Sequence, residues 1–92
     1  MHYAVLCHDK PGAIDVRKAN RDAHLAHLRS IGDQIFAAGP LLGEDGQSMI
    51  GSLLVIDFPD RKAAEAFAAN DPYAKAGLFQ SVTITPWKKV LP

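Results

Sequence analysis

Apolar residues dominate four short segments of the chain, which predicts β-strands whose alternate residues point to opposite faces. The four segments are His2–His8, Gln34–Leu42, Met49–Phe58 and Ser81–Trp87. Both faces of the first and third segments are mostly apolar, so we expect these strands to lie inside a sheet that is covered on both sides. Gly39-Pro40 interrupts the second segment, which indicates an edge strand, a bulge or a strand end, because proline cannot donate to a ladder.

Two other segments have the apolar spacing of helices. The first runs from about Asp15 to Ile31, with Asp15 as the expected N-cap and Gly32 as the stop. The second, DRKAAEAFAAN, begins at its expected N-cap, Asp60.

The first predicted helix carries cationic residues on the side that should be buried. At about 100° per residue, this side carries the apolar residues Ile14, Leu25, Leu28 and Ile31. Arg17, Arg21 and His24 fall on the same side. Burying such side chains is costly unless each finds a partner, and a pocket that holds or transforms a ligand is one explanation. The alternative is that the arginines reach solvent at the rim and His24 is a satisfied core histidine.

The predicted order is strand, helix, strand, strand, helix, strand, with turns at Asp9–Gly12 and Glu44–Gln47. This is the order of a ferredoxin-like α+β unit, in which two helices cover one face of a four-stranded antiparallel sheet. The apolar residues on the other face need a second cover, and no element of the 92-residue chain is left to supply it. We therefore expect residues 1–92 to form a single domain that pairs sheet to sheet as a homodimer.

Composition excludes several classes of partner. Ten Lys and Arg residues balance ten Asp and Glu residues, so the formal net charge is zero. Nucleic acids and anionic membrane surfaces attract basic patches, and we expect neither as a partner. No apolar run approaches the roughly 20 residues of a membrane span, and Met1 leads into a strand rather than a signal peptide. The lone Cys7 cannot form an internal disulfide, which favours the cytoplasm.

His24 is the first candidate for chemistry, because an imidazole with an ordinary pKa of about 6.5 exchanges protons near neutrality. A histidine base normally has a carboxylate that orients its other ring nitrogen. Asp71 is our candidate, because the loop after the second helix lies next to the first helix in this fold. The alternative is that Asp71 is only the N-cap of a turn that starts at Pro72 and runs to Gly77.

Other polar residues have both functional and structural interpretations. Arg17 and Arg21 are fork-shaped donors suited to carboxylates, phosphates or enolate oxygens, but rim salt bridges would also explain them. Ser52 lies in an apolar strand, so its hydroxyl needs a ligand or a backbone partner. Cys7 is expected to serve packing, since no nearby residue is placed to activate a thiolate.

A metal site is the less favoured interpretation of the histidines. His24 and His27 are spaced i, i+3, and His8 or Asp71 could complete a ligand set. However, a helix turns His27 about 60° away from His24, and no metal-binding motif supports the site. We expect no metal and no cofactor.

Several short motifs occur together over essentially the whole chain. They are Arg17, Arg21 and His24-Leu25; Ala38-Gly39-Pro40; Gly51-Ser52; Asp71-Pro72-Tyr73 with Ala76-Gly77; and Pro86-Trp87-Lys88-Lys89. In this order and at these spacings, the chain resembles the YciI-like (YCII-related domain) family of small dimeric α+β barrel proteins. The hairpin Glu44–Gln47 is shorter than in some members, which would reshape the mouth of the pocket.

The resemblance implies a His–Asp dyad of His24 and Asp71 in a pocket of the dimer barrel, with Arg17, Ser52 and Pro72 at other pocket positions. The activities it implies are lyase, isomerase or dehalogenation chemistry on small hydroxylated or quinonoid ring compounds.

Two functions follow from this resemblance. The chain is either a cofactor-independent enzyme that uses His24 as acid and base, or a non-catalytic small-molecule binding or sensing protein with the same pocket. An RNA platform is disfavoured because the strand Met49–Phe58 offers aliphatic rather than aromatic residues.

Overall fold

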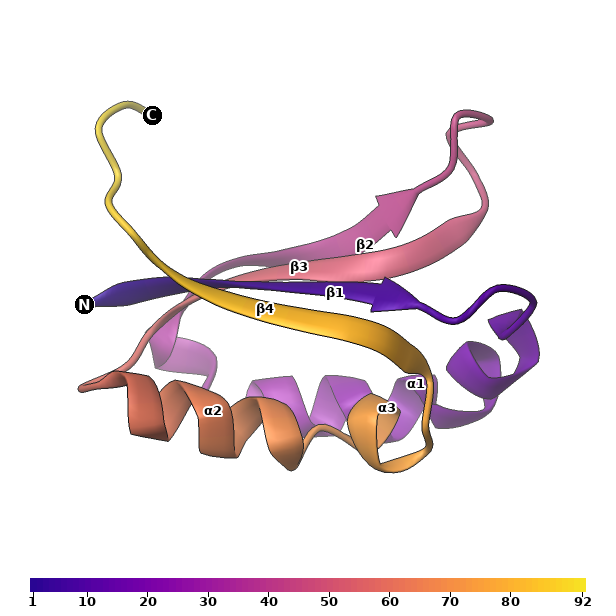
Figure 1. The fold of residues 1–92 in the computed structure, drawn as a ribbon. Coiled ribbons are helices and arrows are strands. Elements are labelled where there is room, and N and C mark those ends of the chain that lie inside the picture. The colour runs from indigo at the N-terminus through magenta and orange to yellow at the C-terminus, as the bar shows by residue number, and fades with distance from the viewer.

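The computed structural model describes residues 1–92 and has two layers, a four-stranded antiparallel sheet and the helices beneath it (Figure 1). The elements are β1 (His2–Asp9), α1 (Ile14–Arg29), a 3-10 turn (Gly32–Gln34), β2 (Ile35–Leu42), β3 (Met49–Asp57), α2 (Arg61–Ala69), α3 (Pro72–Lys75) and β4 (Phe79–Trp87). The strand order is β2-β3-β1-β4. The ferredoxin-like α+β prediction is confirmed, and the two strands with apolar faces, β1 and β3, are the central ones.

The core lies between the central strands and the helices. Cys7 of β1 pairs with Ser52 of β3, and alternate residues on both strands point to the helices. On that face, Tyr3, Val5, Leu54 and Ile56 are buried. The two strands therefore bring a thiol and a hydroxyl side by side onto the floor beneath α1.

Two details of α1 differ from the sequence prediction. The helix begins at Ile14 after Ala13, which makes no side-chain capping bond, so Asp15 is not the N-cap but lies in the first turn. There its charge is favourable to the helix dipole. The helix also ends at Arg29 rather than Ile31, because the chain tightens into the 3-10 turn that leads to β2. The expected caps of the later helices are confirmed, with Asp60 before α2 and Asp71 before α3.

Fewer residues of α1 are buried than the sequence predicts. Arg17, His24 and Leu28 are buried, whereas Ile14 is 37% exposed and Arg21 is also exposed. Seven residues separate Arg17 from His24, which brings them within about 20° of one direction, while Arg21 is turned about 40° from Arg17. Arg21 therefore lies at the edge of the contact with the sheet rather than under it.

The face of the sheet opposite the helices is uncovered in the single chain (Figure 1). Phe36 and Leu53 are 48% and 39% exposed. Phe36 packs against His2 and Trp87 at ring-centroid distances of 6.0 and 5.5 Å. This apolar face is the surface for which the sequence predicts a second copy, and the homodimer stays a prediction. None of the helices has the length and apolar character needed to cross a membrane.

Gly51 of β3 lies where two strands approach closely. A Cβ at this position would overlap the carbonyl oxygen of Cys7 and lie 2.9 Å from Leu41 Cδ1. Because the carbonyl is backbone, the central strands would have to separate to admit any side chain.

We predict that Gly51→Ala destabilises the protein by about 1–3 kcal/mol, the usual cost of overpacking a rigid core position. Urea unfolding followed by circular dichroism measures this change. Gly32→Ala is the control, because a Cβ there meets nothing within 4 Å, and its stability should stay within about 0.5 kcal/mol of wild type. If Gly51→Ala and Gly32→Ala were equally stable, the central strands would admit a side chain at Gly51 without separating.

Candidate functional site

A cavity of about 300 Å³ lies between α1, α3 and the sheet. Its volume is at the lower end of the range for small-molecule sites. Its lining combines apolar walls with four buried polar or aromatic side chains. The lining residues are Arg17, Arg21, His24, Leu25, Leu28, Ala38, Gly39, Pro40, Met49, Ser52, Leu54 and Tyr73.

His24 and Asp71 are in direct contact although 47 residues separate them. The Nδ1 atom of His24 lies 2.9 and 3.0 Å from the two carboxylate oxygens of Asp71. A carboxylate can only accept, so we assign the proton of neutral His24 to Nδ1. Nε2 makes no hydrogen bond, yet every fully buried side-chain nitrogen and oxygen has a partner. Nε2 is therefore accessible, with its lone pair available at the cavity.

The backbone fixes the other side of Asp71. Its Oδ1 also accepts the Tyr73 N–H at 2.9 Å, so the carboxylate caps α3 while it accepts from His24. Pro72 occupies the first position of α3, where its fixed φ favours the helix and no donor is lost.

The Tyr73 ring lies against the side chains of His24 and Arg17 in the cavity. Its ring stacks on the His24 ring at a centroid distance of 4.0 Å and an angle of 15°. The Arg17 guanidinium carbon lies 4.7 Å from the centroid of the Tyr73 ring. Burial raises the pKa of the Tyr73 hydroxyl, while the guanidinium groups of Arg17 and Arg21 act in the opposite direction. Tyr73 thus holds both side chains by stacking and cation–π contact.

Arg17 and Asp9 form a buried ion pair. Arg17 Nε donates to Asp9 Oδ2 at 2.7 Å, and Nη2 donates to Asp9 Oδ1 at 3.1 Å and to Ser52 Oγ at 2.9 Å. The side chains of Arg17 and Asp9 are only 4% and 6% exposed. Burial alone would lower the pKa of Arg17, but the hydrogen bonds and charge of Asp9 outweigh burial and raise it. Because Ser52 accepts from Arg17, its own proton is free to be donated into the cavity.

The structure brings four of the five predicted site residues together at the cavity, and the fifth, Pro72, does not line it. Arg17, His24 and Ser52 line the cavity, and Asp71 supports it from behind His24. Pro72 is not among the lining residues, so in the single chain it is placed to shape α3 rather than to contact a ligand.

The other histidines lie outside the cavity. His27 bonds through Nε2 to the Phe67 carbonyl oxygen at 3.0 Å, and its ring stacks on Phe67. His8 is exposed at the end of β1.

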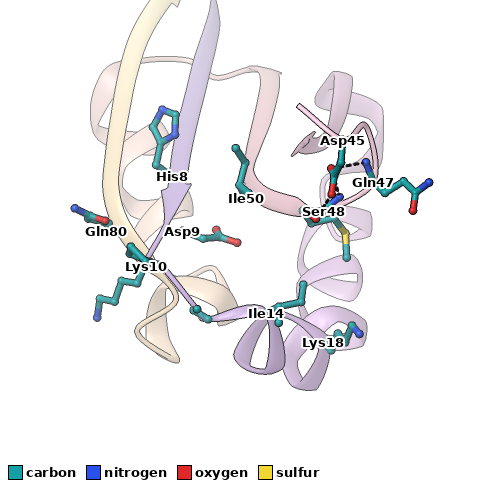
Figure 2. A pocket seen from close by; sticks show the side chains of 14 residues that line it. His8, Asp9, Lys10, Ile14, Lys18, Asp45, Gln47, Ser48, Ile50 and Gln80 are labelled. Carbon is teal, nitrogen blue, oxygen red and sulfur yellow. Dashed lines mark hydrogen bonds between the residues drawn. The ribbon is translucent and has the colours of Figure 1, made fainter. Parts of the chain in front are cut away.

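A larger hollow of about 790 Å³ lies at the end of the sheet, beside the hairpin between β2 and β3 (Figure 2). Its polar lining, which includes Lys10, Lys18 and Gln80, is exposed. Asp9 also borders this hollow, but its carboxylate is held by Arg17. We therefore place the candidate site in the smaller cavity, where buried polar groups converge.

Two residues of the site, Asp9 and Tyr73, have no role in the sequence-based prediction. The predicted turn at Asp9–Gly12 is wrong for Asp9, which is the last residue of β1. Its contact with Arg17 depends on how α1 returns over the end of that strand. Tyr73 appeared only as part of the motif Asp71-Pro72-Tyr73. The stacking of Tyr73 on His24 depends on where α3 packs against α1, and the sequence carries no local signal for it.

Together, the fold and the cavity define a class of protein, a ferredoxin-like α+β domain with a small polar-floored pocket under its sheet. Residues 1–88 match the family model of the YCII-related domain, so the chain belongs to this family. Two relatives agree over nearly their whole length. Protein YciI of Escherichia coli is 34% identical, covering 98% of this chain and 99% of the relative. An uncharacterized protein of Haemophilus influenzae is 33% identical with the same coverage.

Two solved structures are also similar. The 5-chloro-2-hydroxyhydroquinone dehydrochlorinase (TftG) of Burkholderia phenoliruptrix AC1100, in complex with 2,5-dihydroxybenzoquinone, is 36% identical with a TM-score of 0.89. The match covers 96% of this chain and 94% of that protein. An antibiotic biosynthesis monooxygenase is 15% identical with a TM-score of 0.50, and covers 99% of this chain and 98% of that protein. This second likeness shows the shared fold alone.

We predict that Asp9→Asn destabilises the protein by about 3 kcal/mol, because it leaves the charge of Arg17 buried without its partner. Urea unfolding at pH 7 measures the loss. The matched control is Asp22→Asn, since Asp22 is exposed on the outer side of α1 and should change stability little. If Asp9→Asn leaves the free energy of unfolding almost unchanged, water or a rearranged side chain must replace the ion pair.

A second prediction concerns pH. Burial, with the charges of Asp71 and Asp9, raises the pKa of the Cys7 thiol from 9.0 to about 12. Between these values the folded state keeps a proton that the unfolded state loses, so stability falls as pH rises, by up to about 1.4 kcal/mol per pH unit. We expect wild type to lose more stability than Cys7→Ala between pH 9 and pH 11. If wild type and Cys7→Ala lose the same stability over this pH range, the raised pKa of Cys7 is contradicted.

Proposed function

We propose that the protein is a cofactor-independent enzyme that carries out general acid/base chemistry on a small hydroxylated or quinonoid ring compound. His24 is the base and acid, and Asp71 orients it. One observation carries the proposal: an accessible imidazole nitrogen, fixed from behind by a buried carboxylate, opens on a cavity of about 300 Å³. Such a group is positioned to exchange a proton with a bound ligand.

The first proposed step is removal of a proton from a ring hydroxyl by His24 Nε2. The resulting negative charge is shared by the oxygen and the conjugated ring carbons. Asp71 stabilises the imidazolium that forms, since its carboxylate lies 2.9 Å from Nδ1. The imidazolium then returns the proton to a ring carbon, which gives an isomerase-type reaction.

A leaving group on that carbon extends the reaction to a lyase. When the carbon carries chloride, the carbon–chlorine bond breaks as a second ring hydroxyl loses its proton, and the ring becomes a quinone. The net change is loss of one HCl, with no external oxidant or reductant. Ser52 and Arg17 stabilise the ring oxyanion, through the free proton of Ser52 and the positive charge of Arg17. Pro72 contributes by fixing the start of α3, and with it Asp71.

The comparison with TftG supports this substrate class. That protein is named as a dehydrochlorinase of a chlorinated hydroxyhydroquinone and binds a dihydroxybenzoquinone, and this chain is 36% identical to it over 96% of its length. The cavity is of a size suited to a single substituted ring.

The proposal includes a homodimer in the cytoplasm. The exposed apolar face of the sheet supports the dimer, and the single buried cysteine suits a reducing compartment.

We predict that His24→Ala lowers kcat by about 10²–10⁴-fold, the usual contribution of a positioned acid or base. The assay is chloride release from 5-chloro-2-hydroxyhydroquinone, with circular dichroism to show that the fold is retained. His8→Ala is the control, because His8 is exposed outside the cavity and should leave kcat unchanged. Asp71→Asn should also lower kcat while α3 keeps its cap, since asparagine caps helices about as well as aspartate.

Chloride release by His24→Ala at the wild-type rate would contradict the proposed mechanism. Saturable binding of ring compounds by the wild type, without turnover of any of them, would instead identify a small-molecule binding or sensing protein.

A further inference from the structure

Arg21 is the one charged side chain of the cavity lining that has no protein partner. Arg17 is paired with Asp9, and His24 is in contact with Asp71. Arg21 lines the same cavity, is exposed, and makes neither an ion pair nor a hydrogen bond. The charge of Arg17 on the floor of the cavity is therefore compensated by Asp9, whereas the positive charge of Arg21 at the rim has no carboxylate partner in the chain.

The position of Arg21 directs this charge toward the cavity. It lies one helical turn after Arg17 and just under one turn before His24 on the same helix, and it lines the cavity together with them. Its guanidinium acts on the Tyr73 hydroxyl, where it favours the anionic form and so counters the effect of burial on the pKa.

The walls between the rim and the floor are apolar. They are formed by Leu25, Leu28, Ala38, Pro40, Met49 and Leu54. These apolar walls match a ligand with a flat, weakly polar body.

We propose that Arg21 binds a negatively charged oxygen of the ligand, so that the substrate enters as an anion: a ring compound with an ionised acidic hydroxyl or a carboxylate. This inference rests on the proposed function and narrows its substrate class. Arg21 is then a specificity-determining residue, since it selects ionised rings over neutral ones of the same size. The guanidinium suits this role because it is always charged and can bind two oxygens at once.

The test compares two ring ligands in calorimetric titrations at pH 7. The anionic probe is 2,5-dihydroxybenzoquinone, an acidic vinylogous carboxylic acid. The neutral probe is hydroxyhydroquinone, titrated without oxygen so that it is not oxidised to an acidic quinone. We expect Arg21→Gln to weaken binding of the anionic probe by about 10-fold or more, as for loss of a charge-assisted hydrogen bond, with little effect on the neutral one. Arg21→Lys should restore part of the affinity. Arg29→Gln is the control, because Arg29 is exposed on α1 but does not line the cavity.

Each other outcome overturns a definite part of the argument. If Arg21→Gln binds the anionic probe as tightly as wild type, or weakens both probes equally, the role of Arg21 is wrong and the proposed function stands. If His24→Ala retains wild-type turnover while Arg21→Gln loses anion affinity, the mechanism fails and the binding role stands. If wild type binds neither probe, both are overturned.

Discussion

The Asp71 carboxylate holds the site together because it has two partners from different parts of the chain. It accepts the Tyr73 N–H that begins α3 and lies in hydrogen-bonding distance of His24 on α1. The short helix therefore cannot form in its observed position without presenting a carboxylate to the imidazole. The same turn places the Tyr73 ring against His24, so a local capping interaction also determines the orientation of a side chain 47 residues away.

The polar floor is stable because its charges are paired where they are buried. A buried charge without a partner would lower the stability of the fold by several kcal/mol. Asp9 and Arg17 avoid this cost because the Asp9 carboxylate accepts two hydrogen bonds from Arg17. No buried side-chain nitrogen or oxygen is left without a partner. Any polar atom without a protein partner is therefore accessible, and the free proton of Ser52 at the cavity is available for a ligand.

The sequence predicted the order of elements well because period-two and helical patterns are local properties. The N-caps Asp60 and Asp71 were also predictable, since capping needs only a short polar side chain before a helix. Asp9 and Tyr73 were not assigned to the site, because their roles depend on contacts between elements far apart in the chain. The pairing of His24 with Asp71 needed the predicted fold as well as the residues. The capping of α1 was predicted wrongly, because the turn at Gly12 delivers the chain with Ala13 rather than Asp15 at the helix start.

The spacing of the cations on α1 explains how one helix supplies both the floor and the rim of the cavity. Residues seven apart point in nearly the same direction, so Arg17 and His24 both face the sheet and both need carboxylates. Arg21, between them, is rotated by about 40° from Arg17 and stays at the edge, where solvent removes the need for a partner. The three side chains therefore have two different environments. Arg17 and His24 are buried and each contacts a carboxylate, whereas the exposed Arg21 has no protein partner and its charge is available to a ligand.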